Sequence, residues 1–362
     1  MNRASKLLSA LSKVQSRSAG RCFIGFDGFI DEITEAVDKR NAEGYQKIPT
    51  ITSFAERIAS FVGKSGNIEL YPLRRKIGGN GPILAMGLIA GGQQVRLAGA
   101  LGSPEIEPIF HPLKEKCEAL YSFAESGHSD AIEFNDGKVI FGKMAEIKKI
   151  SAEKVLASIP SIEKVLDEAD LIASVNWTML PMMNRLWEIL LQQYTPRLSG
   201  KTRYFFVDLA DPEKRTDADL VKALSLLKQL ERHFKVILGL NLREAERVSK
   251  SANIPPSLDQ QNGVQEWIKK LQHQLGLSQV ILHSARFATD GKFYVQGPFT
   301  DKPLLKTGAG DNFNAGYLNG ILYGFDPELC LLSGMYTAGY YVREGKSPEK
   351  QELISFLGGK KN

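Results

Sequence analysis

Short runs of Val, Ile, Leu and Phe alternate along this chain with longer segments whose apolar residues recur at helical spacing. The short runs lie at 21–26, 95–102, 171–176, 203–209, 235–241 and 279–285. Most are apolar on both alternating faces, which is typical of strands buried between two layers of helices. Helical patterns cover 151–168, 179–193, 217–233 and 264–275. The alternation predicts an α/β fold, a three-layer sandwich around a central, mostly parallel sheet.

Two further segments have clear local signals. Residues 131–143 alternate in two arms on either side of Asp136-Gly137, which predicts a β-hairpin. We expect this hairpin to belong to a small β-lid built from insertions, with an ornamental hairpin as the alternative. Asp326 followed by Pro327 predicts an N-cap and the first position of a helix that reaches about residue 342.

The N-terminal segment differs in composition from the rest of the chain. Its first 21 residues carry five serines and several Lys and Arg but no acid, as an organelle transit peptide does. Leu7, Leu8, Leu11 and Val14 also share one helical face, which favours a packed helix. We therefore predict an N-terminal helical segment at 1–20, followed by a single α/β domain with its lid at 21–362.

Composition narrows the classes of function. The 362 residues are 43% hydrophobic and 24% charged, as in soluble globular proteins, and no apolar run reaches 18 residues. The net charge of +5 comes from Lys and Arg scattered among acids, which argues against nucleic-acid and membrane partners. Cys22, Cys117 and Cys330 form no CxxC pair, so a zinc site or disulfide framework is not indicated. We expect a cytoplasmic protein in a reducing compartment.

One loop combines bare backbone with a carboxylate. Gly308, Ala309 and Gly310 directly precede Asp311, and apolar residues at helical spacing follow. Small residues let a ligand approach the main chain, and exposed amides at a helix N-terminus suit a phosphate. Asp311 then either caps the helix or acts as a base beside the bound phosphate. The chain has no GxxxxGK[ST], GxGxxG, HExxH or GxSxG motif, so other common phosphate and hydrolase sites are not indicated.

With this loop, the sequence from about residue 21 to 357 resembles the ribokinase-like (PfkB) family of carbohydrate and nucleoside kinases. The segment "TGAGDNFNAGYLNGILYG" is similar to the family's C-terminal signature. The resemblance implies that the amides of Gly308, Ala309 and Gly310 form an anion hole for the transferred phosphate of ATP. It also implies that Asp311 is the catalytic base that deprotonates the acceptor hydroxyl.

The resemblance also assigns the sugar site. Residues 77–92 resemble the family's GGxGxN segment, in which a Gly pair acts as a hinge, here Gly78 and Gly79, and Asn80 takes the first polar position. Residues 24–33 resemble the first strand, whose end carries an Asp that binds sugar hydroxyls. The candidates for that Asp are Asp27 and Asp31. The resemblance implies Asn176 as a further sugar contact. The spacing from Gly25 favours Asp31 over Asp27.

The metal site is implied in the same way. Residues 239–246 resemble the NxxE motif, so Asn241 and Glu244 would organise Mg²⁺ through waters and help to bind the nucleotide with Gly308 and Gly310. Oxygen ligands suit Mg²⁺, which keeps most of its water shell. Taken alone, NxxE is also a common helix N-terminus.

Several positions depart from the family pattern. Leu305 and Lys306 replace the Asp and Thr that help to bind a monovalent cation, and Ile83 replaces an expected polar sugar contact. The family's central DPNxR is stretched here, with only Asp208 recognisable. Before the hinge, Arg74, Arg75 and Lys76 form either a solvated basic turn or contacts to a substrate phosphate.

The resemblance predicts an ATP-dependent sugar kinase that phosphorylates a primary hydroxyl, with Mg²⁺ as its metal. It also predicts a homodimer formed through the lid. The alternatives are a nucleoside kinase of the same fold and a catalytically silent sugar-binding regulator.

Overall fold

A computed structural model describes residues 3–14 and 19–359, and its centre is a nine-stranded sheet. The strand order is β14-β13-β12-β11-β10-β9-β1-β5-β6, and all pairs from β12 to β6 are parallel. The antiparallel β13 and β14 complete one edge. The strand bounds are β1 Arg21–Gly25, β5 Gln94–Gly99, β6 Ala119–Ser122, β9 Leu171–Val175, β10 Tyr204–Asp208, β11 Lys235–Asn241, β12 Gln279–His283, β13 Phe287–Thr289 and β14 Tyr294–Gln296.

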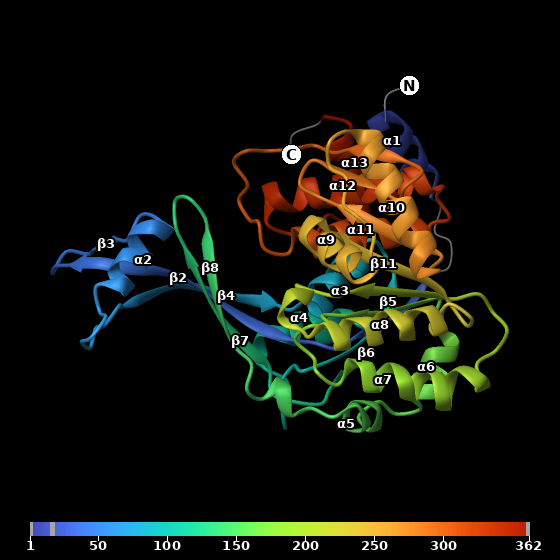
Figure 1. Cartoon of the computed structure of the whole chain (residues 1–362), viewed down its shortest axis with the longest axis horizontal. Helices are drawn as coiled ribbons and strands as arrows, with labels where there is room; N and C mark the ends of the chain where they lie inside the picture. The colour runs from blue at the N-terminus through green and yellow to red at the C-terminus, as the bar shows by residue number, and fades with distance from the viewer. Residues whose placement is uncertain (1–2, 15–18, 360–362) are drawn as a thin grey trace.

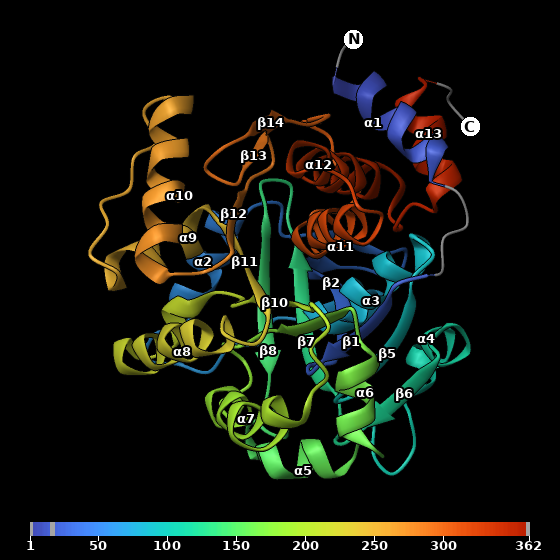
Figure 2. The same cartoon turned by 90° about the vertical axis from the view of Figure 1, so that its right-hand side faces the viewer.

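Helices cover both faces of this sheet, as Figures 1 and 2 show. One hydrophobic cluster joins the sheet to α5 Ala152–Ala157, α6 Ile162–Glu168, α7 Met183–Ile189, α8 Asp217–Leu230, α9 Leu242–Ser251 and α10 Gln261–Leu275. A second cluster joins the opposite face to α1 Arg3–Lys13, α3 Asn80–Ala90, α4 His111–Lys116, α11 Ala309–Leu322, α12 Pro327–Glu344 and α13 Lys350–Leu357. The predicted three-layer α/β sandwich is confirmed.

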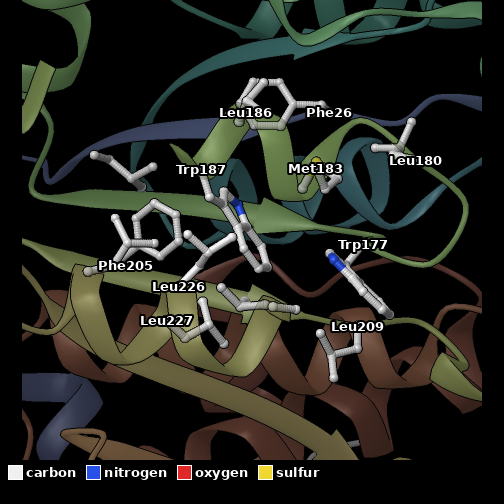
Figure 3. Close-up of a cluster of buried hydrophobic side chains, with 14 of the residues drawn as sticks. Phe26, Trp177, Leu180, Met183, Leu186, Trp187, Phe205, Leu209, Leu226 and Leu227 are labelled. Carbon is white, nitrogen blue, oxygen red and sulfur yellow. The ribbon is translucent and has the colours of Figure 1, made fainter. Parts of the chain in front are cut away.

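The two-sided apolar pattern of the strands explains these layers. On β10, Phe205 and Val207 belong to the first cluster, whereas Phe206 between them belongs to the second. Figure 3 shows part of the first cluster, to which Trp187 of α7, Phe205 of the sheet and Leu226 of α8 all belong. The indole N–H of Trp187 donates to Ser174 Oγ at 2.9 Å, so this buried ring leaves no donor unpaired.

A second sheet forms the lid, which projects from the sandwich in Figure 1. It contains β2 Phe29–Arg40, β3 Tyr45–Lys47, β4 Leu70–Gly78, β7 Gly127–Glu133 and β8 Lys138–Lys143, and α2 Ile51–Ala59 packs on its outer part. The predicted hairpin is confirmed as β7 and β8, which pair antiparallel around residues 134–137. The lid is larger than this hairpin because β2 pairs with β4 on one side and with β7 on the other.

Two predicted helices were wrong in detail. The segment 151–168 forms α5 and α6 instead of one helix, because Pro160 lies between them and cannot continue a helix without losing a hydrogen bond. The segment predicted at 179–193 becomes α-helical only at Met183, after Pro181, and its last turn, Leu190–Tyr194, is π-helical. The predicted Asp326 N-cap is confirmed, since its side chain accepts from the amide of Leu329.

The N-terminal segment contains the packed helix α1, with Leu7 and Leu11 buried against the sandwich. It lies beside α12 and α13, and Lys350 Nζ donates to the carbonyl of Val14 at 3.1 Å. Residues 1–2 and 15–18 of the predicted segment lie outside the described residues. None of the described helices is both long and apolar enough to cross a bilayer.

Candidate active site

The glycine-rich loop begins α11 with an N-terminus that no side chain caps. Gly308 is the N-cap residue, with φ of +91°, and no side chain accepts a hydrogen bond at this cap. A Cβ at Gly308 would also lie only 2.7 Å from the Tyr341 hydroxyl, so both conformation and space require glycine here. The amide of Ala309 donates to the carbonyl of Lys306 at 3.3 Å, so the positive end of the helix dipole opens chiefly on the amide of Gly310, which is available to an anion.

Asp311 does not cap this helix. It is the third residue of α11, and its Oδ1 accepts from Asn80 Nδ2 at 2.7 Å. Burial raises the pKa of Asp311 to about 7, and the nearby carboxylates of Asp27 and Glu244 act in the same direction. A carboxylate whose pKa lies close to neutral pH is suited to take up and release a proton.

Asn80 begins α3 and joins Asp311 to a second carboxylate. Its backbone amide donates to Asp27 Oδ2 at 2.8 Å, and the amide of Gly81 donates to Asp27 Oδ1 at 2.7 Å. Asn176, which has a positive φ of 58°, donates from Nδ2 to Asp27 Oδ2 at 2.6 Å. Asp27 is 0% exposed, so its carboxylate fixes the start of α3 and is closed to solvent.

Asp31 is the more available of the two predicted sugar ligands. It lies on β2 of the lid, not at the end of β1 as expected, because the chain turns into a new strand at Phe29. Its Oδ1 accepts from Ser129 Oγ at 2.6 Å. A Cβ at Gly78 would overlap the Asp31 carboxylate, so glycine permits this close approach. Gly79, with φ of +89°, connects β4, which ends at Gly78, to α3.

The NxxE segment forms a capping box at the start of α9. Asn241 Oδ1 accepts from the amide of Glu244 at 3.1 Å, and Glu244 Oε2 accepts from the amide of Asn241 at 2.9 Å. The second carboxylate oxygen of Glu244 accepts from the amide of Asp211 at 3.1 Å. Asp211 and Ala210 both have positive φ, which turns this loop so that the amide faces Glu244.

Asp208 adds a third carboxylate beside Asp311 and Glu244. Its Oδ2 accepts from Asn314 Nδ2 at 2.8 Å. Burial, followed by repulsion from Glu244 and Asp311, holds the pKa of Asp208 well above its usual value. The pKa of Glu244 is raised mainly by burial. Mutual repulsion of this kind is relieved by a cation.

The residues fit a water-shelled magnesium ion better than a directly ligated metal. Within residues 3–14 and 19–359, no three His, Cys, Asp or Glu side chains are grouped so that they hold a metal themselves. The oxygens of Asp208 and Glu244 already accept amide hydrogen bonds but retain further lone pairs. Mg²⁺ usually keeps several waters, and these oxygens are suited to accept hydrogen bonds from such waters.

A cavity of about 570 Å³ opens directly on the start of α11. Its walls come from the ends of β11 and β12, the loop before α11, and α12; they include Asn241, His283, Ser284, Ala285, Phe299, Lys306, Ala309, Gly310, Phe313 and Val342. His283 stacks on Phe313 with ring centroids 4.5 Å apart, and burial lowers the pKa of His283 to about 4, so the ring is neutral. The end of β12 and the residues that follow it, His283 to Ala285, therefore contribute to this wall.

Two functional candidates escaped the sequence patterns. Asn312 donates from Nδ2 to the Gly308 carbonyl at 2.9 Å and accepts from Ser347 Oγ at 2.7 Å, which fixes the loop. The sequence carries no separate signal for it, because Asp311 and Asn314 are polar neighbours in the same turn of α11. Of the two alternatives for residues 74–76, the turn was wrong, because these residues belong to β4, where Arg74 and Arg75 are exposed and Lys76 is largely buried. Contact of this segment with a substrate phosphate stays a prediction. Lys138, on β8 of the lid, reaches Thr307 beside Gly308.

Comparison with known proteins gives consistent matches over nearly the whole chain. A family model described as prokaryotic ketohexokinase matches residues 8–360. The ketohexokinase of Haloferax volcanii is 26% identical over 349 residues, which cover 94% of this chain and 91% of that protein.

Solved structures share the fold at lower identity. The ribokinase of Thermotoga maritima has a TM-score of 0.61 at 18% identity, covering 94% of this chain and 99% of its own. The ribokinase of Arabidopsis thaliana, solved with ribose and ATP, has a TM-score of 0.59 at 15% identity, with coverage of 94% and 99%. The ribokinase of Cryptococcus neoformans, solved with ADP, has a TM-score of 0.59 at 17% identity, with coverage of 95% and 100%. These likenesses confirm the ribokinase-like fold.

Asp311→Asn should stabilise the protein at alkaline pH. Because the folded state raises the pKa of Asp311 to about 7, ionisation of this group opposes folding, and its stabilising contribution is lost as the pH rises through that value. Thermal unfolding should show a higher melting temperature for the variant at pH 8 and a smaller difference at pH 5. The exposed Asp259→Asn serves as the control, with no pH-dependent difference. A melting temperature at pH 8 equal to or below that of the wild type would contradict the assignment.

Proposed function

This chain belongs to the prokaryotic ketohexokinase family, and we propose that it transfers the γ-phosphate of ATP to a primary hydroxyl of a ketohexose. The family and the Haloferax relative make it an ATP-dependent sugar kinase, a phosphotransferase with an alcohol group as acceptor. One observation supports the specific mechanism: Asp311, with its pKa near neutrality, directly follows Gly310 at the start of α11, which no side chain caps.

In this mechanism Asp311 is the catalytic base. The acceptor hydroxyl approaches its carboxylate, which takes the proton as the oxygen attacks the phosphorus. Asn80 Nδ2 holds one carboxylate oxygen in place, so the other remains free for the acceptor. The amides of residues 308–310 and the helix dipole stabilise the negative charge on the phosphoryl oxygens during transfer.

The cavity beside α11 takes the nucleotide. Its volume and its apolar walls suit the base and ribose, while the phosphates point to the amides of Ala309 and Gly310. Lys306 lies on the same wall and is exposed, so it is placed to contact the phosphates. Because His283 is neutral and stacked on Phe313, it contributes an apolar surface instead of a charge.

Mg²⁺ would be held through water by Asn241, Glu244 and Asp208. When bound, it would neutralise charge on the nucleotide phosphates. The three side chains keep their own network of amide hydrogen bonds, so they offer ordered oxygens at the ends of β10 and β11. The sugar contacts are Asp31 and the start of α3 at Gly79 and Asn80, and Asn176 acts indirectly by fixing Asp27.

We also propose a homodimer through the lid. Large apolar side chains are exposed on its strands and on α2 and the turn after it: Ile58, Val62, Tyr71, Leu73, Ile140 and Phe141. β4 and β8 are edge strands, whose free backbone groups and exposed apolar side chains favour pairing with a second copy.

Asp311→Asn should lower kcat with a ketohexose by roughly 10²–10⁴-fold, the usual contribution of a general base. The affinity for ATP should change little, because the α11 amides remain. In the wild type, kcat/KM should rise with pH through about 7 and then level off, since only the ionised carboxylate accepts the proton. The measurement is a coupled ADP-release assay across pH, with Asp259→Asn as control. Full activity of the Asp311 variant would exclude the role of base.

A panel of acceptors tests the substrate class. ATP consumption with ketohexoses, aldoses and nucleosides should be fastest with a ketohexose. Preference for a nucleoside would make the chain a nucleoside kinase. Ligand-induced rises in melting temperature without any turnover would indicate a silent sugar-binding regulator.

Glu244→Gln should raise the Mg²⁺ concentration for half-maximal activity by about tenfold, which is the usual effect of losing a group that hydrogen-bonds to a ligand of the metal. Glutamine keeps the capping box but removes the charge, so the melting temperature should stay within a few degrees of the wild type. The measurement is a Mg²⁺ titration at saturating ATP and sugar. Glu246→Gln, two residues further along the same helix, exposed and outside the walls of the nucleotide cavity, is the control. An unchanged Mg²⁺ requirement would remove Glu244 from the metal site.

Leu73→Asp combined with Phe141→Asp should convert a dimer into a monomer, because the charges oppose burial of the lid surface. Light scattering after size exclusion should give twice the mass of one chain for the wild type and a single-chain mass for the variant. The exposed Val221→Asp on α8 should leave the mass unchanged. A monomeric wild type would refute the proposed dimer.

A further inference from the structure

The inner face of the lid carries an excess of cations next to the start of α11. Strand register places Lys76 of β4 opposite Asp31, which in turn lies opposite Ser129 of β7. Lys138 of β8 pairs with Glu133, an even number of residues from Ser129, so it belongs to the same face of the sheet. Arg74, two residues before Lys76, shares this face too.

Lys76 lacks a hydrogen-bond acceptor for its ammonium group. Its Nζ is buried, makes no hydrogen bond, and lies 3.8 Å from Asp31 Oδ2. Burial lowers the pKa of Lys76, and Lys138 and Arg74 repel the charge further, while Asp31 and Asp311 favour it. A buried ammonium without an acceptor is costly, so the site is complete only when an acceptor arrives.

Lys138 extends the same positive region to the glycine-rich loop. Its Nζ lies 2.9 Å from Glu133 Oε1 and donates to Thr307 Oγ1 at 3.4 Å. Thr307 directly precedes Gly308, and its carbonyl accepts from the Tyr341 hydroxyl at 2.8 Å. The ammonium groups of Lys76 and Lys138 therefore lie near enough to repel each other, and the carboxylate of Asp311 lies near enough to attract Lys76.

We propose that Lys76 and Lys138 together bind a phosphate group between the lid and the start of α11. The inference rests on the proposed kinase function and extends it to the lid. A phosphate at this place has cations on the lid side and helix amides on the other, which is the environment that phosphate oxygens require. Lys76 is not simply the partner of Asp31, because Asp31 already accepts from Ser129 and Lys76 makes no hydrogen bond to it.

Two sources of phosphate meet this description, and each predicts different kinetics. One is the transferring phosphoryl group of the nucleotide, which would make both lysines catalytic residues. The other is a phosphate ester already present on the acceptor sugar, which would make them determinants of substrate choice.

The test compares Lys76→Met and Lys138→Met with the wild type, using fructose and fructose 6-phosphate as acceptors. Lys143→Met is the matched control, because Lys143 lies on β8 with the opposite orientation and its side chain is 65% exposed. Lys76→Arg keeps the charge and should restore part of any loss. Melting temperatures check folding. Calorimetry with the non-hydrolysable β,γ-imido analogue of ATP and with fructose 6-phosphate measures binding without turnover.

If the site holds the nucleotide phosphate, both methionine variants should lower kcat with fructose by at least tenfold. KM for fructose should change less than threefold, and the ATP analogue should bind more weakly. If it holds an acceptor phosphate, activity on fructose should stay and KM and Kd for fructose 6-phosphate should rise at least tenfold. Kinetic and binding constants within twofold of the wild type for both acceptors and the analogue would overturn the proposal.

Failure of the proposed function is separate from failure of this site. A wild type that phosphorylates no sugar would refute the kinase activity, whereas an active wild type with fully active lysine variants would refute only the lid site. The calorimetric comparison decides for or against the lid site in either case.

Discussion

The candidate site depends on the hydrogen-bonded path from Asp27 through Asn80 to Asp311. Asp27 is buried and holds the first amides of α3, and the side chain of Asn80 then donates to the carboxylate of Asp311, the proposed base. This path joins two helices that are more than 200 residues apart in sequence. Because each oxygen of Asp27 already has a donor, the start of α3 has little freedom, and neither has the base that it orients.

Close helix packing supports the same arrangement. A Cβ at Gly316 would lie 2.5 Å from Thr337 Oγ1 on α12, and a Cβ at Gly320 would lie 2.9 Å from Cys330 Cα. These glycines let α11 press against α12, while Gly87 of α3 gives room to Ala315 on the other side of α11. The start of α11 is thus set by contacts along its length, so the loop before it needs no regular structure to place the anion-binding amides.

The sequence revealed the features whose cause is local. Continuous apolar runs predicted six of the seven parallel strands, since a strand covered on both faces needs apolar residues at every position. The short edge strand β6 was missed. Asp136-Gly137 predicted the hairpin, and the glycine loop predicted the helix start. The full lid was not predictable in this way, because β2 acquires its partners from residues 70–78 and 127–133, and such pairing leaves only a weak local signal. The spacing from Gly25 favoured Asp31 over Asp27, but only the tertiary packing shows that Asp27 is buried against the start of α3 whereas Asp31 lies on the lid. The positive φ of Ala210 and the isolation of Lys76 arise only from tertiary packing.

The direct passage from β4 into α3 through Gly79 separates motion of the lid from motion of the reacting groups. Asn80, the first residue of α3, follows Gly79 and is held in place by Asp27. A lid that tilts about Gly79 would therefore leave Asn80 and the proposed base where they are. Sugar entry and product release would then require no realignment of the reacting groups in each cycle.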